Sequence, residues 1–486
     1  MKSTWFLGVV EARSLLAALL IVTPAMGQPA ALDTSRAAAL FPFNPAIETA
    51  FQEGVDAWED GRYDDAYQRF RAIIEAPENR RTTAAMLMGG RSLLAAGRFA
   101  ESSGLLTAFI RRYPESRYYD SAVGLRDAAQ ERYNLGIEAA RDVFLIGVLL
   151  PMTSRALRFT RSAFEGIRMA ADEFNARGGR TVRLIFEDSG GEPRKARAAV
   201  RRLIDRAGPT VIIGPLFSEE AIAAAEVAED AGVPLLVPLA TDEAVARGRT
   251  NVFQANPTYE MRGRLMARRV VRNLRYTKIG VIADSASYAA RMARGFIDEA
   301  DDLGAATPLV GFLGGLSDWY ALADRFGADA LAHVDGLYIP VTGDDARGII
   351  NVALTSLERT SPRIPLFGNG EWADYPDASR MALHKTLYTV DFVIDSTRAE
   401  VVQFDQEYRR RTGEPPDKPA FVGFDVTRFL LQLATDLDEK ASLPHAFRTR
   451  ARYEGLGIRL YFGDGQVNQS VFFHSYGDNG VTRRED

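Results

Sequence analysis

Residues 144–215 read FLIGVLLPMTSRALRFTRSAFEGIRMAADEFNARGGRTVRLIFEDSGGEPRKARAAVRRLIDRAGPTVIIGP and decide the fold. An initial apolar segment is followed by a loop and by an amphipathic stretch with helical spacing over about 162–175. A second strand pattern (181–187), a helix rich in Arg and Ala, and a third apolar strand (210–213) come next. Strand, helix, strand, helix, strand at this spacing predicts a parallel sheet with right-handed crossover connections.

The loops that follow these strands are the expected ligand site. In an open parallel sheet, ligands bind beyond the carboxyl ends of the strands. Those loops begin here at Pro151, Asp188 and Pro215, and none has the glycine cluster that cradles a phosphate. The pattern favours a sheet that holds a ligand over one that transforms it.

The composition is that of an ordinary globular chain. The 486 residues are 47% hydrophobic and 25% charged, which allows two or three domains. The formal net charge of −5 gives no reason to expect nucleic acid as a partner, because the many Arg residues alternate with Glu and Asp on helix faces.

Residues 1–27 have the features of a signal peptide. A basic residue, Lys2, precedes an apolar core over 15–22, and the small residues Ala25 and Gly27 stand before the expected cut. The chain contains no cysteine, so it offers no residue for a lipid anchor after the signal. We therefore expect an exported chain that is soluble in the periplasm, with an uncleaved membrane anchor as the alternative.

A linker is expected over 28–45 and a helical-repeat domain over 46–140, with its junction at 135–142. Features recur at about 34 to 36 residues: Gly54 as Gly90 and Gly124, Gly61-Arg62-Tyr63 as Gly97-Arg98-Phe99, and Phe70 as Leu106. With small residues such as Ala66 and closing prolines at Pro77 and Pro114, the segment resembles tetratricopeptide helical hairpins. The resemblance implies two hairpins, a third that begins at Ser116, and a groove for a protein partner. The alternative is that these helices only pack on the larger domain.

From residue 142 to the end, strand and helix patterns alternate. Further strands are predicted at 235–238, 278–283, 336–341, 365–367 and 387–392, and helices at 261–274, 289–303 and 421–434. Two sets of alternating units suggest two α/β lobes, and a cleft between lobes is a common ligand site.

A series of short motifs runs through this region in a specific order. They are Ile146-Gly147-Val148-Leu149-Leu150-Pro151, Gly166, Asn175 with Gly178-Gly179, Glu187-Asp188, Ile213-Gly214-Pro215, Gly232-Val233-Pro234, Pro238-Leu239-Ala240-Thr241, Gly423-Phe424-Asp425 and the stretch 463–477. Through them, about 340 residues resemble type I periplasmic binding proteins of the leucine/isoleucine/valine-binding kind. The implied fold is an α/β, two-lobed type I periplasmic-binding fold behind an N-terminal all-α helical-repeat domain. Lobe one would cover about 142–256 and 391–455, and lobe two about 257–390 and 456–486.

The resemblance also implies where the lobes pivot and where a ligand binds. Asn256-Pro257 and Val390-Asp391 are the hinge candidates. In amino-acid-binding members, a hydroxyl and backbone N–H groups at helix N-termini hold the ligand carboxylate. The matching positions are Ser218 and Ala240-Thr241. Because Glu219 and Glu220 follow it, Ser218 equally fits a plain helix N-cap that needs no ligand.

On the other lobe, the family's tyrosine before a helix is matched by Tyr288, although Ala289 replaces the usual glycine after it. The acidic residue that meets a ligand ammonium is best matched by Glu371, after a shift of one residue. The loop after the first strand departs from the family, since it carries Arg155 and two further arginines where small residues are usual. These arginines can bind an anionic ligand, fill the cleft or face a protein.

Enzymatic motifs are missing. The four histidines have no metal-ligand spacing, and there is no Gly-x-Ser-x-Gly, Walker or Gly-x-Gly-x-x-Gly motif. No enzyme activity and no cofactor is therefore expected. The preferred hypothesis is a solute-binding protein that captures a small polar ligand, amino-acid-like or anionic, and serves an inner-membrane permease or sensor.

The alternative hypothesis is a cell-envelope scaffold or regulator whose cleft binds no solute. Helical repeats joined to this fold are similar in architecture to the outer-membrane activators of penicillin-binding proteins, which stimulate peptidoglycan synthesis. Its partner would then be a cell-wall synthesis enzyme. Those activators are lipoproteins, however, and this chain has no cysteine to carry the lipid.

Overall fold

The computed structural model of the chain describes residues 41, 43–134, 143–178, 181–285, 288–360, 363–436, 442–450, 452–477 and 480–484. The expected signal peptide, most of the expected linker and the expected junction lie outside the described residues. The chain divides into two compact units, residues 1–127 and 128–486, which are considered separately.

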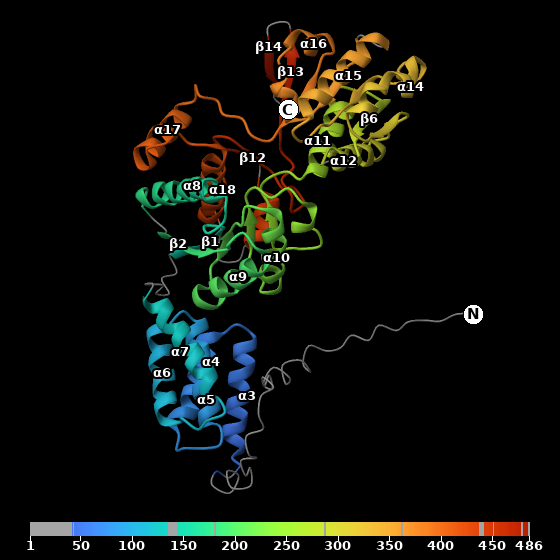
Figure 1. The fold of residues 1–486 in the computed structure, drawn as a ribbon. Helices are drawn as coiled ribbons and strands as arrows, with labels where there is room; N and C mark the ends of the chain where they lie inside the picture. The colour runs from blue at the N-terminus through green and yellow to red at the C-terminus, as the bar shows by residue number, and fades with distance from the viewer. Residues whose placement is uncertain are drawn as a thin grey trace, which may run out of the picture. The chain divides into compact units, whose positions relative to one another are not determined.

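The N-terminal unit is all-helical where it is described. Its helices are α3 (Pro45–Glu59), α4 (Tyr63–Glu75), α5 (Thr82–Ala95), α6 (Phe99–Arg112) and the start of α7 (Tyr119–Asn134) (Figure 1). Helices α3 and α4 form one hairpin and α5 and α6 a second, with α4 packed on α5.

The two hairpins have matching turns. Gly61 and Gly97 both have a φ of 75°, in the left-handed region that glycine tolerates. After each glycine, a backbone N–H closes the turn on the preceding helix: Arg62 donates to the Ala57 carbonyl at 2.9 Å and Arg98 to the Leu93 carbonyl at 2.8 Å. The predicted helical repeats are thus confirmed in this all-helical region.

The recurring helix glycines have a packing role in the first two copies only. A Cβ added at Gly54 would lie 2.8 Å from the ring of Phe70, and one at Gly90 would lie 2.6 Å from Leu106. The corresponding position in α7, Gly124, has nothing within 4 Å of an added Cβ. In the described residues, α7 therefore lacks the packing partner that its counterparts have.

Lobe one contains a parallel sheet in the order β2-β1-β3-β4-β5. Its strands are β1 (Val143–Leu150), β2 (Thr181–Asp188), β3 (Val211–Ile213), β4 (Leu235–Val237) and β5 (Val252–Gln254). Its helices are α8 (Leu157–Ala176), α9 (Pro193–Ala207), α10 (Ser218–Asp230), η1 (Glu243–Val245), α17 (Ala399–Thr412), α18 (Lys418–Asp436) and α19 (Leu443–Thr449), and a small ladder joins β11 (Tyr453–Glu454) to β12 (Arg459–Leu460).

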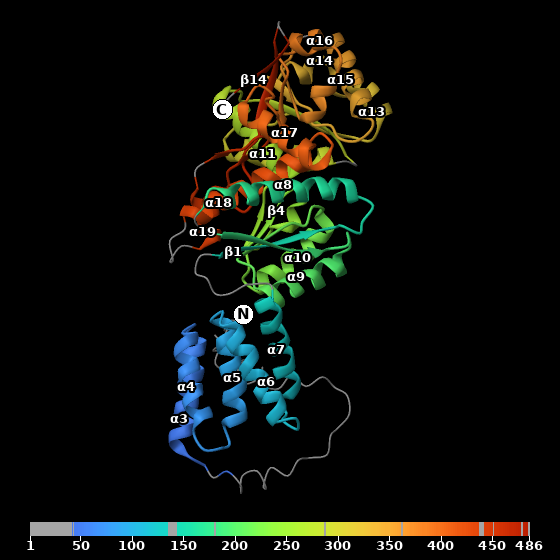
Figure 2. The ribbon, with the colours of Figure 1, turned by 90° about the vertical axis from the view of Figure 1, so that its left-hand side faces the viewer.

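The alternation of side chains along the strands builds a core on each face of this sheet. Ile146, Val148 and Leu150 belong to the core beneath α8 and α18. Leu149 and Ile212 belong to the core beneath α9 and α10. Figure 2 shows α8 on one side of the strands and α9 and α10 on the other.

Lobe two contains a mixed sheet in the order β14-β13-β10-β9-β8-β6-β7, in which β13 pairs antiparallel with both β10 and β14 and the other pairs are parallel. Its strands are β6 (Ile279–Asp284), β7 (Val310–Leu313), β8 (Gly336–Tyr338), β9 (Leu366–Gly368), β10 (Leu387–Val390), β13 (Phe472–Gly477) and β14 (Gly480–Arg484). Its helices are α11 (Tyr259–Arg268), the π-helical turn η2 (Arg269–Asn273), α12 (Tyr288–Asp302), α13 (Leu316–Tyr320), α14 (Leu322–Leu331), α15 (Ala346–Thr360), η3 (Gly370–Asp374) and α16 (Ala378–Leu383).

The predicted two-lobed α/β class is confirmed, but the expected lobe boundary at residue 456 is wrong. Ile458 and Phe462 are buried in the lobe-one core, and Val467 packs against that lobe's other core. Asn468 holds this segment against lobe one, because its Nδ2 donates a hydrogen bond to the Ala255 carbonyl at 2.8 Å. Val471 is the first residue of this segment in a lobe-two core, so the chain crosses about 12 to 15 residues later than expected.

Glycines allow two pairs of helices to pack backbone against backbone. A Cβ at Gly166 in α8 would lie 2.0 Å from the Ala420 carbonyl oxygen, and one at Gly423 in α18 would lie 2.3 Å from that of Ala163. Helices α11 and α12 meet in the same way at Gly263.

We expect Gly166→Ala to destabilise the chain by about 1–3 kcal/mol or more, because the added methyl group meets rigid backbone and the two helices must separate. The matched control is Gly348→Ala in α15, where the added Cβ meets only Leu316 at 3.7 Å. Urea unfolding measures both variants. Equal midpoints for the two would contradict this account of the α8–α18 contact.

Candidate functional site

Two loops at the carboxyl ends of β3 and β4 are tied together by Ser218. Its Oγ accepts hydrogen bonds from the backbone N–H groups of Thr241 and Asp242, each at 3.3 Å. The N-cap position of α10 is Phe217, and Ser218 is the first helical residue. The hydroxyl hydrogen of Ser218 is donated to no acceptor in the described part of the chain, so it can serve an incoming anion.

A buried carboxylate supports this arrangement from below. Glu220 is 1% exposed; its Oε2 accepts a hydrogen bond of 2.6 Å from Ser189, and its Oε1 accepts one of 3.3 Å from the Phe217 N–H. Burial raises the pKa of Glu220 even though these hydrogen bonds oppose the rise. Because Ser189 follows β2, this bond fixes the β2 and β3 loops to each other.

The loop after β1 is held in a similar way. Asp188 Oδ1 accepts the N–H groups of Met152 at 2.9 Å and Gly190 at 2.8 Å. Burial alone would raise the pKa of Asp188, but the hydrogen bonds to its carboxylate lower it. The loops at this edge of lobe one are therefore preorganised by polar contacts within the protein.

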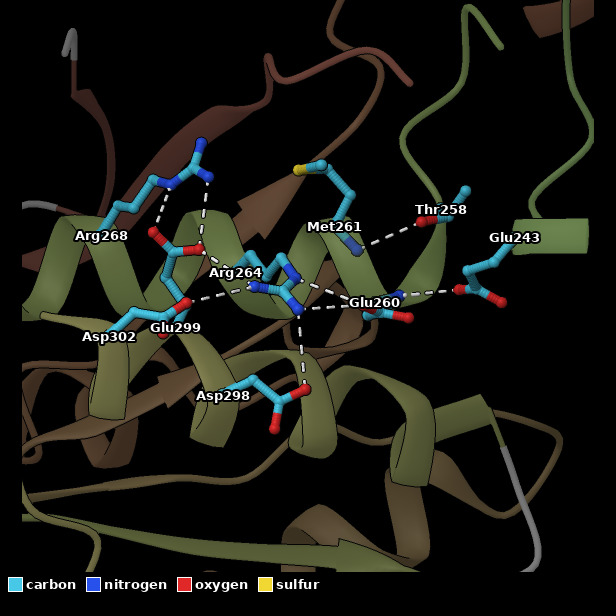
Figure 3. A network of polar contacts seen from close by, with 9 residues as sticks. All are labelled: Glu243, Thr258, Glu260, Met261, Arg264, Arg268, Asp298, Glu299 and Asp302. Atoms are coloured by element: carbon cyan, nitrogen blue, oxygen red, sulfur yellow. Dashed lines mark hydrogen bonds and ion pairs between the residues drawn. The ribbon is translucent and has the colours of Figure 1, made fainter. Parts of the chain in front are cut away.

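A cation from lobe two reaches this edge. Arg291, in the first turn of α12, places Nη1 at 2.9 Å from Asp242 Oδ2 and 3.0 Å from Glu243 Oε2. Glu243 also accepts the Glu260 N–H at 3.1 Å, at the start of α11 (Figure 3). These contacts join the two lobes next to Ser218.

Two tyrosines of lobe two form a stack beside this bridge. The rings of Tyr259 and Tyr288 are 4.5 Å apart and nearly parallel, at 9°. The Arg262 guanidinium lies over Tyr259 at 5.2 Å and the Arg291 guanidinium over Tyr288 at 5.7 Å. Each ring of the stack thus has a guanidinium over it. The stacked rings attract each other, and each ring also attracts the cation beside it.

Arg262 connects the two predicted hinge segments. Its Nη2 donates to Asn256 Oδ1 at 3.1 Å and to Asp391 Oδ2 at 2.9 Å. Lys418 reaches the same oxygen of Asp391 at 2.8 Å. Burial alone would raise the pKa of Asp391, but Arg262 and Lys418 lower it to about 2.

A second ionic cluster holds the helices that carry these residues. Figure 3 shows Glu299 of α12 between Arg264 and Arg268 of α11, with contacts of 3.3 Å and 2.7 Å. Burial would raise the pKa of Glu299, but the two arginines lower it. Arg268 also donates to Gln469 Oε1 at 2.9 Å, beside the last crossing between the lobes. The cluster fixes α11 against α12 and so fixes Tyr259 relative to Tyr288.

Comparison with known proteins identifies the family. A family model described as periplasmic binding protein matches residues 144–480. The chain belongs to this family. An amino acid binding protein of Pseudomonas aeruginosa is 28% identical over 229 residues, which are 46% of this chain and 61% of that protein. The Leu/Ile/Val-binding protein BraC3 of Rhizobium johnstonii is 27% identical over 155 residues, or 31% of this chain and 42% of that protein. The matches thus span about half of each curated relative.

Solved structures share the fold of the periplasmic binding protein region. A putative branched-chain amino acid ABC transporter from Rhodospirillum rubrum matches with a TM-score of 0.57 and 20% identity, covering 70% of this chain and all of that one. An ABC transporter substrate-binding protein from Desulfitobacterium hafniense, solved in complex with Leu, matches with a TM-score of 0.50 and 24% identity over the same shares. Within the described residues, no helix is long and apolar enough to cross a membrane.

The structure brings most of the predicted site residues to one region. Ser218 bonds to the Thr241 N–H, and Ala240 is buried with its carbonyl accepting Gln254 Nε2 at 3.2 Å. Tyr288 stays half-exposed, at 53%, beside the inter-lobe bridge.

Glu371 is placed near the same network, and Arg155 is not. Glu371 lies in η3, where burial and then Asp374 raise its pKa while the nearby charge of Arg262 lowers it. Arg155 is exposed on the loop after β1 and makes no contact with this group in the described structure. The ligand-binding roles of all these residues remain predictions.

Sequence reasoning missed the residues that bridge the lobes. Asp242 and Glu243 directly follow the predicted Ala240-Thr241, and Arg291 follows Tyr288 by one helical turn. Their proximity to the predicted residues was the available signal, because residues three apart on a helix share a face. The pairing itself joins segments about fifty residues apart, so no local pattern contains it.

We expect Arg291→Gln to loosen the approach of the two lobes in the ligand-free chain. The change removes the cation shared by Asp242 and Glu243, so α12 is no longer held to the loop after β4. Because the native chain has no cysteine, spin labels can be attached at Arg161→Cys and Tyr320→Cys, on exposed positions of α8 and α13. The distance distribution between the labels should broaden and shift to longer values.

The control for this experiment is Arg294→Gln, which removes an exposed arginine from the same helix one turn further on. It should leave the label distances unchanged. Identical distributions for Arg291→Gln and Arg294→Gln would show that the bridge does not hold the lobes together.

Asp391→Asn should lower stability at neutral pH by about 2 kcal/mol, because the folded pKa of about 2 lies below the ordinary value of 3.8. A lowered folded pKa means that the ionised form stabilises the fold fully above about pH 4, and that this contribution is lost as the pH falls through about 2. The difference between the two proteins should therefore shrink over that window. Urea unfolding between pH 2 and pH 7 measures it, with exposed Asp230→Asn as control. A difference that does not change with pH would contradict the assignment.

Proposed function

We propose that this member of the periplasmic binding protein family is an exported, non-enzymatic solute-binding protein that captures a small polar ligand with an anionic group between its lobes. The observation that carries the proposal is the pairing of Ser218, with its bonded Thr241 and Asp242 N–H groups, with Arg291 from the other lobe. A hydroxyl donor and a guanidinium from opposite lobes meet at this edge. An anion bound there contacts both lobes and so favours the closed arrangement.

The chemistry of the site supports a carboxylate as the bound group. The Ser218 hydroxyl has an unused hydrogen in the described structure, and Arg291 is shared by two carboxylates that a ligand oxygen can replace. Tyr288 offers a half-exposed ring beside them for the rest of the ligand. Glu371 is the candidate partner for a ligand ammonium, which would make the ligand amino-acid-like.

The similar proteins support the same ligand class. The relatives are named as amino acid and Leu/Ile/Val-binding proteins, and one structural neighbour was solved with Leu. We extend this to the present chain as a proposal, together with delivery of the ligand to an inner-membrane permease or sensor. In the same proposal, the helical repeats, which are tetratricopeptide-like, bind a protein partner.

Thermal unfolding against a panel of amino acids, small carboxylates and the corresponding amides tests the proposal. A ligand at a hundredfold its dissociation constant adds about 2.7 kcal/mol of stability, which raises the Tm by a few degrees. Acids should raise the Tm and their amides should not, because an amide carries no negative charge for Arg291 or Ser218.

Ser218→Ala should weaken the binding of an active acid by about tenfold, because it removes the hydroxyl donor and leaves two N–H groups without their acceptor. Isothermal titration measures the dissociation constant. Ser317→Ala, on the exposed surface of α13, is the matched control and should bind as the unchanged protein does. A ligand whose affinity is the same in both variants would bind elsewhere.

A second candidate function is a cell-envelope scaffold or regulator whose lobes bind no solute, such as an activator of peptidoglycan synthesis. The Arg291 bridge favours it, since the protein's own carboxylates Asp242 and Glu243 already join the two lobes there. If no compound raises the Tm of either the unchanged protein or Arg291→Gln, this second function replaces the first.

A further inference from the structure

A cavity of about 580 Å³ lies in the helical-repeat unit. It is formed by the loop between α4 and α5 and the loop between α6 and α7, at the ends of the hairpins. The residues that matter for its chemistry are Arg80, Arg81, Ala84, Arg112, Pro114 and Arg117. Its volume is in the range of pockets that enclose a ligand or a peptide side chain with its neighbours.

Two of the arginines share a single carboxylate. Glu48 Oε2 accepts Arg81 Nε at 2.7 Å, and Glu48 Oε1 lies 3.3 Å from Arg80 Nε. Glu48 is only 17% exposed, so its charge is committed to this pair. One negative charge therefore faces two positive ones on this side of the cavity.

The opposite side holds its cations loosely. Arg112 reaches Glu78 only at 3.5 Å, and both side chains are largely exposed, at 64% and 42%. Exposed pairs of this kind contribute little and exchange readily with other partners. Arg117 donates to the Tyr118 hydroxyl at 2.5 Å and has no carboxylate partner within the described ranges. These two guanidinium groups are available to a bound anion.

The cavity also has apolar and orphaned polar walls. Ala84 is buried, and Pro114 and the ring of Tyr113 line the same space. The Tyr113 hydroxyl lies near Glu78 and Arg112, yet it is buried without a hydrogen bond of normal geometry. Inorganic phosphate would leave the apolar walls uncovered, and a flat lipid surface cannot enter a concave site. A peptide with carboxylates beside an apolar side chain satisfies both kinds of wall.

We propose that this arginine cavity binds an acidic peptide segment of a partner protein, with peptide carboxylates on Arg112 and Arg117 and an apolar side chain against Ala84 and Pro114. Guanidinium groups suit this role because their planar donors match a carboxylate in pairs. This inference rests on one part of the proposed function, namely that the helical repeats bind a protein partner, and it adds the chemistry of the peptide that they bind.

Fluorescence anisotropy of the full mature chain tests this, with a short labelled peptide in which Glu alternates with Leu. The peptide should bind, and the same peptide with Gln in place of Glu should not. The double variant Arg112→Ala/Arg117→Ala should weaken binding by about tenfold or more, since it removes charged hydrogen bonds. Arg112 has only its exposed contact with Glu78 at 3.5 Å, and Arg117 has no carboxylate partner in the described ranges, so the variant should unfold at nearly the same temperature as the unchanged protein.

Arg111→Ala is the control, because it also removes a positive charge from α6. Arg111 is exposed next to Arg112 on α6 but does not line the cavity, so this variant should bind the peptide as before. Equal losses in the Arg111 variant and the double variant would reduce the effect to general charge and overturn the proposal. So would the absence of binding to the Glu peptide.

Competition with the labelled peptide tests whether another kind of anion is the preferred ligand of the cavity. If inorganic phosphate or vesicles containing anionic lipid displace the peptide at lower concentration than an unlabelled copy of it, the assignment to a peptide fails. The thermal-shift response to small carboxylates is measured on the same double variant. If the double variant loses peptide binding but its Tm still rises with small carboxylates, the change acts on the arginine cavity and leaves the proposed solute site intact. The two sites can therefore fail independently in these measurements.

Discussion

The arrangement of the two lobes depends on a carboxylate shared by two cations at the point where the chain crosses between them. Asp391 follows the last parallel strand of lobe two and bonds to Arg262 of α11 and Lys418 of α18. With 14% of its side chain exposed, Asp391 is ionised and largely removed from water. Moving Lys418 away would leave a largely buried carboxylate with one cation instead of two, so this contact opposes separation of the lobes at this point. We expect motion of one lobe against the other to turn about it.

This pivot gives the other inter-lobe contacts different roles. Arg262 also bonds to Asn256, so the first and second crossings are both fixed at one place. The Arg291 bridge to Asp242 and Glu243 lies beyond the tyrosine stack, and its arginine is 39% exposed. A partly solvated ion pair is weaker and more easily exchanged than a buried one. The contact at Asp391 is therefore the stronger candidate for a hinge, and the contact at Arg291 is the one that we propose a ligand replaces.

The sequence predicted the elements with strong local patterns and missed those fixed by distant contacts. Strands β4, β6, β9 and β10 lie within a residue or two of the expected segments because each is a short apolar run bounded by turn residues. The segment 456–462 was assigned to the wrong lobe because it contains no long element, and only its burial beside α8 and α18 places it.

The candidate site, too, was predictable from the sequence only in part. The family likeness pointed to Ser218, Thr241 and Tyr288, and the structure brings these loops and Tyr288 into one region. It could not supply Arg291 as the bridging group, because that role arises only when α12 of one lobe approaches the β4 loop of the other. Charged residues on helix surfaces are common, and nothing in the local pattern separates Arg291 from its exposed neighbour Arg294.

Under the proposed function, the same bridge favours one class of ligand over another. In the structure, Asp242 and Glu243 both pair with Arg291, and Ser218 accepts two N–H groups. Under this proposal, a neutral ligand carries no charge that can replace a carboxylate at Arg291, so it gains less from contacting both lobes. In the proposed binding mode, an anionic ligand replaces one protein carboxylate at Arg291 and also accepts the Ser218 hydroxyl hydrogen, which no protein carboxylate accepts in the described structure. Its advantage is the difference between these two sets of contacts, and each 1.4 kcal/mol of it shifts the population of lobes about tenfold. The two proposed functions thus differ in whether a ligand displaces a protein carboxylate from one arginine.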